Sequence, residues 1–322
     1  MKRLFFAVLA VATLASCAKE EAIRVDQGEA IAFGDAFVDN ATRAIYESAE
    51  DITGFTVFGQ VGQNVEGNQI SYVALYGDGA EVTRNGAALG AAWSCNATRY
   101  WIPSSTFNFA AIANGTASTS TLVNGLPTKI DYTVVDLDPA DLIYATATAT
   151  TDAQSVPTGN VDETSKVVKF SFKHLLSRVK VSFVNLIQGT EYTYKITNVK
   201  VTTWNKGTYT IGETTPWTRT GEGNAVLNYN DINSLAYNTT TGAGAKLVIP
   251  GSSVTLSFEY ELLLNGTKIY GTTVTKENVI TPQQNYSYNI TVQLKAGNMI
   301  DFTVDSTNGL TDWPENPETV IE

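Results

Sequence analysis

The stretch VTLSFEYELLL, from Val254 to Leu264, decides the fold class of this chain. Every second residue in it is apolar: Val254, Leu256, Phe258, Tyr260, Leu262 and Leu264. A period of two places these side chains on one face of a β-strand. Asn265-Gly266 follows directly, and this dipeptide favours a two-residue hairpin. The stretch therefore predicts a strand that pairs with the chain continuing through Ile269.

The same alternation recurs along most of the chain. It is clearest from Tyr286 to Leu294, and it is also present in residues 168–172, 179–183 and 130–134. Shorter runs surround Phe55, Tyr72 and Phe107, and glycine- or asparagine-containing turns separate them. Residues after the first 17 show no helical period. The pattern predicts an all-β protein built from β-sandwich domains.

The length of 322 residues favours two domains over one. Residues 152–165 contain Pro157, Gly159, Asp162 and Glu163 without apolar periodicity, which is typical of a linker. We therefore expect one β-sandwich over residues 44–160 and a second over residues 161–322.

The first 17 residues have the order of a secretory signal. Lys2 and Arg3 precede a mostly apolar run that ends at Leu14-Ala15-Ser16-Cys17. This ending resembles a bacterial lipobox, which implies cleavage before Cys17 and lipidation of that cysteine. An ordinary signal peptide that contains a cysteine is the alternative. A lipidated Cys17 leaves Cys95 alone, so that no disulfide forms within the chain.

Residues 18–43 form a leader segment between the signal and the first domain. The pattern around Ile31 and Phe33 predicts one short strand within it. Arg43 ends the leader in a polar, loop-like stretch.

Composition and single residues exclude several function classes. The formal net charge of −11 and the absence of a basic patch argue against nucleic acid as a partner. His174 is the only histidine, which excludes a two-histidine metal site; we interpret it as a polar side chain at a strand corner. No motif predicts a cofactor, a metal or a catalytic site, and we expect no enzymatic activity. Trp101 and Trp217 are candidate contacts for glycan rings, although such aromatic residues more often pack inside the protein.

Six stretches resemble one known family in their order and spacing. They are residues 99–111, which include RYWIP and FNFAA; residues 141–145, DLIYA; residues 168–183, which include FKHLLSRV; residues 247–250, LVIP; residues 285–288, NYSY; and residues 300–313. Together they resemble the fimbrillins of Bacteroidetes, the subunits of type V pili.

The resemblance implies two tandem transthyretin-like β-sandwiches and export as a lipoprotein to the outer-membrane surface. It also implies an arginine-specific protease that removes the leader, and partners that are further pilus subunits. Arg24 precedes the leader strand and Arg43 follows it, so that only a cut at Arg43 would release the strand. The candidate donor strand, which would enter a neighbouring subunit, contains Ile300, Phe302 and Val304. Its alternation suits an ordinary last strand of the second domain equally well.

Two classes of function remain open at this point. The first is a structural pilus subunit, in a stalk, tip or anchor position, that supports adhesion by assembling through strand exchange. The second is a surface lipoprotein that keeps its anchor, never polymerises and binds glycans or other surface ligands.

Overall fold

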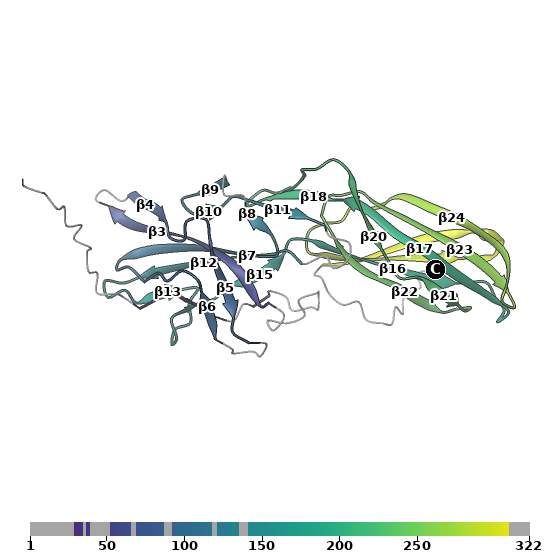
Figure 1. Cartoon of the computed structure of the whole chain (residues 1–322), viewed down its shortest axis with the longest axis horizontal. Coiled ribbons are helices and arrows are strands. Elements are labelled where there is room, and N and C mark those ends of the chain that lie inside the picture. The colour runs from purple at the N-terminus through teal and green to yellow at the C-terminus, as the bar shows by residue number, and fades with distance from the viewer. Residues whose placement is uncertain are drawn as a thin grey trace, which may run out of the picture.

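The computed structural model describes residues 29–34, 37–38, 52–65, 69–86, 92–117, 121–134 and 141–308. Within these residues the regular elements are β-strands, apart from one short 3₁₀ helix, η2 (Ala296–Asn298). The strands form two halves joined end to end in an elongated molecule (Figure 1). The all-β prediction is therefore confirmed.

The first half is built around one sheet of nine strands. Its hydrogen-bonded order is β2 (Phe37–Val38), β15 (Ser171–His174), β12 (Ile143–Thr151), β7 (Ser105–Ala113), β3 (Gly54–Val65), β5 (Ala80–Arg84) and β6 (Trp93–Cys95), with β13 (Pro157–Gly159) beside β12 and β4 (Gln69–Ala74) beside β3. In β12 the alanines are buried and Thr146, Thr148 and Thr150 are exposed, as a period of two requires. The central β7 has an uninterrupted buried run, because both of its faces are covered.

Two short strand pairs complete this half. β1 (Ala32–Phe33) pairs in parallel with β14 (Val167–Val168). β9 (Leu122–Val123) forms a hairpin with β10 (Leu126–Pro127). The predicted strand around residues 31–33 is thus present.

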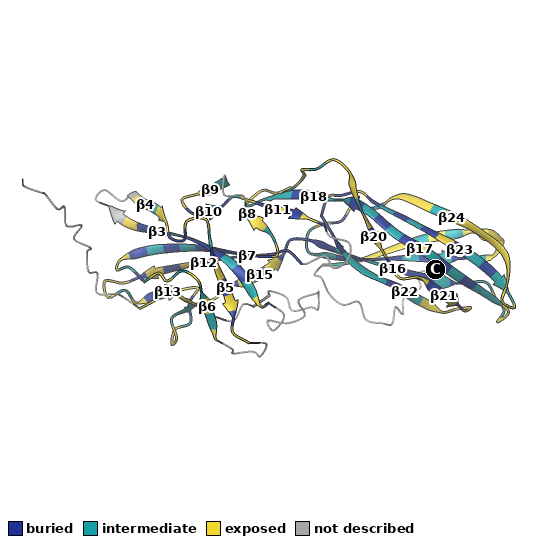
Figure 2. Ribbon diagram, in the orientation of Figure 1, coloured by how far each residue is buried: buried dark blue, intermediate teal, exposed yellow. Residues whose placement is uncertain are grey.

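The second half is a sandwich of two sheets. The first of these sheets has the order β22 (Thr240–Val248), β16 (Ser177–Asn185), β25 (Tyr286–Leu294) and β26 (Ile300–Asn308). The other has the order β20 (Asn224–Asn228), β17 (Tyr192–Trp204), β23 (Val254–Leu264) and β24 (Thr267–Ile280), and β21 (Ile232–Leu235) also pairs with β17. The hairpin between β23 and β24 turns at Asn265 and Gly266, whose φ angles of 50° and 79° fit the predicted asparagine–glycine turn. The edge strand β24 is mostly exposed (Figure 2).

A third sheet joins the two halves. Its order is β19 (Trp217–Arg219), β18 (Lys206–Thr210), β11 (Lys129–Thr133) and β8 (Thr116–Ala117). Strands that precede and follow the first-half sheet strand β15 in the sequence thus share one hydrogen-bonded ladder. The apolar core of the second half continues through this junction to Phe58, Ala110 and Ile112 of the first half. A second core lies within the first half alone. The junction is therefore packed rather than an open hinge.

The strand pairing favours a domain boundary later in the sequence than the predicted one. Residues 152–165, which the sequence suggested as a linker, contain β13, and this strand pairs with β12. β15 also pairs with β12, which extends the first half to His174. We propose a boundary between β15 and β16, rather than between residues 160 and 161.

The core of the second half generates a first prediction. Phe258 is buried, and its ring meets that of Phe183 edge-on at a centroid distance of 5.0 Å. We expect Phe258→Ala to lower the free energy of unfolding by about 3–5 kcal/mol, the usual cost of such a truncation. Ile269→Ala is the control, because Ile269 lies on β24 and is 51% exposed. Urea denaturation measures both, and equal losses would contradict this assignment of the core.

Candidate functional site

The leader segment lies in a slot of the first half and is paired on both sides. On one side the Ile31 amide donates to the Arg99 carbonyl at 2.8 Å, and the Trp101 amide donates to the Glu29 carbonyl at 3.1 Å. On the other side β1 runs parallel to β14, with Ala32 opposite Val167 and Phe33 opposite Val168. Residues 29–34 therefore act as a strand inserted between two parts of the chain that it keeps apart. We call the space they fill the leader slot.

Side chains of the leader alternate between core and solvent. Ile31 and Phe33 are each only 5% exposed, whereas Ala30 and Ala32 are exposed. The Phe33 ring lies at centroid distances of 5.9–6.4 Å from four aromatic rings, those of Phe55, Tyr76, Phe109 and Phe170. Three of these contacts are tilted or edge-on, and the Phe170 contact is stacked. Phe33 is thus the main apolar anchor of the leader, because aromatic pairs of this kind add to ordinary burial.

Gly34 ends the inserted strand beside the Val167 side chain of β14. A Cβ atom at this position would lie 2.5 Å from Cγ1 of Val167. Real Cβ atoms do not come this close, so a larger residue would require the Val167 side chain to move. Glycine therefore lets the leader lie directly against β14.

A cavity of about 150 Å³ remains beside the leader. The leader contributes Ala30, Ile31, Ala32 and Phe33 to its wall, and the opposite wall comes mainly from Trp93, Ser94, Cys95, Ala97 and Thr98. The Cys95 thiol donates to the Ala97 carbonyl at 3.3 Å. Burial raises the pKa of this thiol, which the Ala97 hydrogen bond and the Arg99 charge partly oppose. The small side chains of Ala30 and Ala32 leave the slot incompletely filled.

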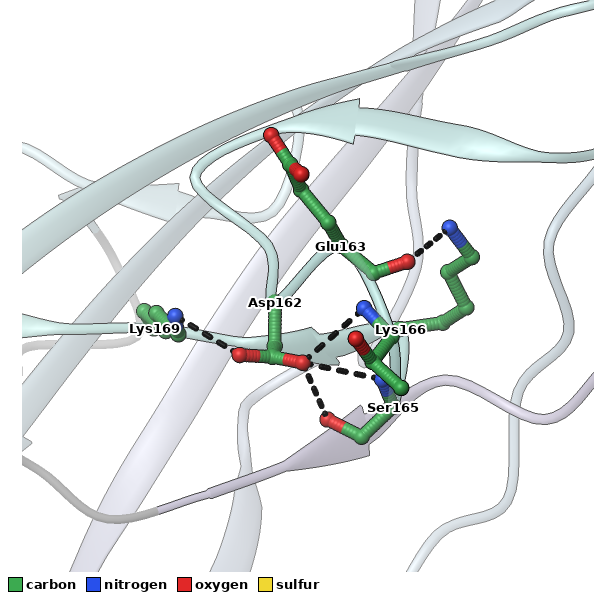
Figure 3. Close-up of polar contacts among 6 residues, drawn as sticks. Asp162, Glu163, Ser165, Lys166 and Lys169 are labelled. Carbon is green, nitrogen blue, oxygen red and sulfur yellow. Dashed lines mark hydrogen bonds and ion pairs between the residues drawn. The ribbon is translucent and has the colours of Figure 1, made fainter.

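An aspartate turn positions the β14 wall of the slot (Figure 3). One carboxylate oxygen of Asp162 accepts hydrogen bonds from the Thr164 amide, the Ser165 amide and the Ser165 hydroxyl at 2.9–3.1 Å. The other oxygen lies 2.8 Å from Nζ of Lys169. The Asp162 amide in turn donates to the Val167 carbonyl. The turn therefore fixes the backbone that leads into β14.

The Lys169 contact, followed by the hydrogen bonds from Ser165 and Thr164, holds the pKa of Asp162 well below its usual range. Because the pKa in the folded state is depressed, the charged carboxylate stabilises the fold above its pKa in the unfolded chain. This contribution is lost as the pH falls through the folded-state pKa.

The candidate donor strand is in place in the second half. Ile300, Phe302 and Val304 lie on β26, which pairs antiparallel with β25 along its full length. Ile300 and Phe302 are half-buried against the core, and Nζ of Lys276 lies 5.7 Å from the Phe302 ring centroid. Val304 is exposed. In the described part of the chain, β25 is the only strand that pairs with β26.

Comparison with known proteins identifies the family of this chain. The model of the family described as "Fimbrillin-like" matches residues 42–312. The chain belongs to the fimbrillin-like family. The family is one of structural adhesion proteins, which confirms the prediction that the chain is not an enzyme.

Two solved structures are similar to this fimbrillin-like chain. A fimbrial protein from Bacteroides vulgatus is 15% identical, with 87% of this chain and 99% of the other covered and a TM-score of 0.56. The fimbrial anchor protein Mfa2 from Porphyromonas gingivalis is 11% identical, with 87% and 96% covered and a TM-score of 0.38. The likeness to the Bacteroides vulgatus protein shows a shared fold. No curated protein matches the chain.

The fimbrillin-like chain does not present Trp101 to a glycan, and this prediction is wrong. The Trp101 side chain is 0% exposed and meets Phe107 and Phe109 edge-on. It lies inside because the neighbouring backbone pairs with the leader at Glu29. Trp217 is half-buried; its indole N–H donates to the Leu175 carbonyl at 2.9 Å, and its ring meets Tyr209. Trp217 thus contributes to the junction between the halves, and glycan contact by Trp217 stays a prediction.

His174 holds the end of β15 from within the protein. Its Nδ1 lies 2.6 Å from Oδ2 of Asp141, and both side chains are buried. Burial raises the pKa of Asp141, and the His174 hydrogen bond and charge oppose that rise. The Asn114 side chain donates to the Asp141 carbonyl, so the pair is part of a small polar cluster at the end of the first half.

The remaining predicted sites lie elsewhere or find no counterpart. Cys17 and Arg43 fall outside the described residues. Among the described residues, no group of three or more His, Cys, Asp or Glu is placed to hold a metal ion. In the same part of the chain, no helix is long and apolar enough to cross a membrane. Sequence reasoning missed the walls of the leader slot, although the glycine after Phe33 and the aspartate before Thr164-Ser165 are local signals for them.

The anchoring role of Phe33 gives a second prediction. Phe33→Ala should weaken docking of the leader by about 3–5 kcal/mol, because four aromatic neighbours lose their contact. Hydrogen exchange of the Ile31 amide should then accelerate, since that amide is protected by Arg99. The matched control is Ala32→Ser, which changes an exposed neighbour. Unchanged exchange in Phe33→Ala would contradict this role.

The aspartate turn gives a third prediction. Asp162→Asn should lower the urea midpoint at pH 7, because it removes the charge that faces Lys169. The difference from the unmodified chain should shrink as the pH falls below about 4, where the carboxylate of the unfolded chain is protonated. Glu163→Gln is the control, because that carboxylate points away from the turn (Figure 3). A difference that does not depend on pH would exclude the charge as its cause.

Proposed function

We propose that this chain is a structural subunit of a type V pilus on the cell surface, polymerised by strand exchange after cleavage at Arg43. In this proposal the chain is exported as a lipoprotein through Cys17 and reaches the outer-membrane surface. Its partners are further pilus subunits, in a homopolymer or a mixed assembly, and the assembled fibre supports adhesion. The stalk position is favoured over tip or anchor.

The observation that carries the proposal is the leader strand. It fills a slot with two anchors, Ile31 and Phe33, and pairs with backbone on both sides. Without it, the slot would present unpaired N–H and C=O groups above an apolar trough, which is the arrangement that accepts an added strand. The leader therefore behaves as a temporary occupant of an acceptor site.

Cleavage at Arg43 would change the competition for the slot. In the intact chain the leader is tethered to β3, so that its effective concentration at the slot is on the order of millimolar or higher. A cut between the two leaves the leader held by the pairing of β1 with β14 and of β2 with β15, by a few further hydrogen bonds and by the side chains of Ile31 and Phe33. A neighbouring subunit can then supply a replacement strand, and its exchange makes the release permanent.

The position of Arg43 provides the fourth prediction. Cells that produce the unmodified chain should show a ladder of high-mass species in unheated detergent gels, which collapses on boiling. Arg43→Ala should remove the ladder, because the leader stays tethered in its slot. Arg24→Ala is the control and should keep the ladder, because Arg24 precedes the leader strand.

Mass spectrometry of the surface protein completes this experiment. An amino terminus at Ala44 in the ladder would support the proposal. A surface pool that carries a lipidated Cys17 throughout, or a ladder that persists in Arg43→Ala, would contradict it. The first of these outcomes would favour an anchor or a lipoprotein that does not polymerise.

A further inference from the structure

The wall of the leader slot continues directly into the second half of the molecule. β14 and β15 lie along the leader, and β16 is an inner strand of a second-half sheet, between β22 and β25. Only Leu175 and Leu176 separate β15 from β16. A change in the position of this wall is therefore transmitted to the start of an inner strand of the other half.

The leader supplies much of the backbone pairing of this wall. Both residues of β14 pair with β1, and residues 171–172 of β15 pair with β2. Only residues 173–174 of β15 pair with β12 of the large sheet. The other backbone partners of β14 are residues 160–162, in the turn that precedes it. The leader is thus the main backbone partner of residues 167–172 outside their own turn.

The side chains of the wall depend on the leader in part. Phe170 stacks on Phe33 at a centroid distance of 5.9 Å, and it also meets Phe55 edge-on at 5.5 Å. Phe172 contacts both Phe170 and Phe55. Loss of Phe33 would therefore remove one ring from this cluster and leave the others in contact. We expect the wall to open locally, not to unfold, when the leader is absent.

The end of β15 carries the contacts that join the two halves. The Leu175 amide donates to the Leu142 carbonyl of the first half at 3.0 Å. The Leu175 carbonyl accepts a hydrogen bond from the Trp217 indole at 2.9 Å, and the His174 carbonyl accepts one from the Gln284 side chain at 3.4 Å. These bonds require one position of the backbone at residues 174–175, so that a displacement of β15 would break them together.

We propose that the leader, while it fills its slot, stabilises the junction between the two halves against local opening. The pairing of β1 and β2 holds β14 and β15 in place, and β15 holds residues 174–175 in the contacts between the halves. Without the leader, this part of the junction opens more often. The inference goes beyond the proposed function, because it concerns the intact chain and needs neither cleavage nor polymerisation. In a pilus subunit, the junction would be adjustable only while the slot is empty.

Hydrogen exchange in the intact chain tests this coupling. Ile31→Asp combined with Phe33→Asp should displace the leader, because the slot would otherwise bury two carboxylates among apolar side chains. We expect exchange of the Leu175 amide to accelerate by about tenfold or more. The Leu186 amide, which donates to the Leu294 carbonyl beyond the other end of β16, should keep its rate.

Two further variants separate this coupling from a general loss of stability. Val57→Ala truncates a buried side chain of β3, which does not pair with the leader in the described part of the chain, and it should leave the Leu175 rate unchanged. Trp217→Phe removes the hydrogen bond to Leu175 and loosens the junction from the other side. Because coupling between two sites is reciprocal, Trp217→Phe should accelerate exchange of the Trp101 amide, which donates to Glu29 of the leader.

Each outcome decides for or against the coupling. Faster Leu175 exchange in the double variant, with faster Trp101 exchange in Trp217→Phe, supports it. An unchanged Leu175 rate while the Trp101 amide exchanges freely overturns it, because the leader then leaves without an effect at the junction. Equal acceleration of Leu175 exchange in Val57→Ala overturns it as well, since general softening would explain both.

Where the double variant fails to fold or keeps its leader docked, Trp217→Phe decides alone. An unchanged Trp101 rate in that variant overturns the inference, and a faster rate supports it. The ladder that follows cleavage at Arg43 tests the proposed function separately, so that its absence leaves this inference standing.

Discussion

The first half has a gap the size of one strand, which the leader fills, and the rest of the structure depends on how this gap is filled. Residues 99–101 and β14 offer hydrogen-bonding groups toward each other across a gap too wide to bridge directly, and aromatic side chains line its floor. Buried backbone groups must be paired, so something extended and apolar has to lie there. Residues 29–34 of the leader supply both needs. The fold of the first half is therefore complete only with an added strand.

The leader completes the fold through backbone pairing and two buried side chains, and the proposed exchange would have to break only these contacts. Ile31 and Phe33 give it two anchors, whereas Ala30 and Ala32 contribute little beyond backbone pairing and leave a cavity. So few contacts are sufficient because the walls of the slot are held in place by other parts of the fold. The Asp162 turn fixes the approach to β14, and glycine at position 34 leaves room for the Val167 side chain. The affinity of the leader for the slot thus depends on the preorganised walls of the slot rather than on a large buried surface of the leader.

The strands themselves could be predicted from the sequence, because their signal is local. The stripe from Val254 to Leu264 and the turn at Asn265-Gly266 are present as expected. Features that depend on distant neighbours could not be predicted. Ser287 and Asn289 alternate with apolar residues as if exposed, yet they are buried, because β25 lies between β16 and β26 and Ser182 reaches Asn289. The burial of Trp101 similarly follows from pairing with the leader, about 70 residues away along the chain.

The packed junction gives the proposed assembly its form. The slot lies in the first half and β26 in the second, so a contact between them joins unlike surfaces of two copies. Such head-to-tail contacts form a closed ring only if the rotation between successive subunits adds up to a full turn. Otherwise they generate open fibres. The fibre keeps a constant geometry only if the two halves of each subunit keep theirs. The ladder of β11 with β18 and the hydrogen bond from Trp217 to Leu175 supply that rigidity. The buried His174–Asp141 pair holds the end of β15 next to Leu175, and thus fixes the side of the junction that belongs to the first half.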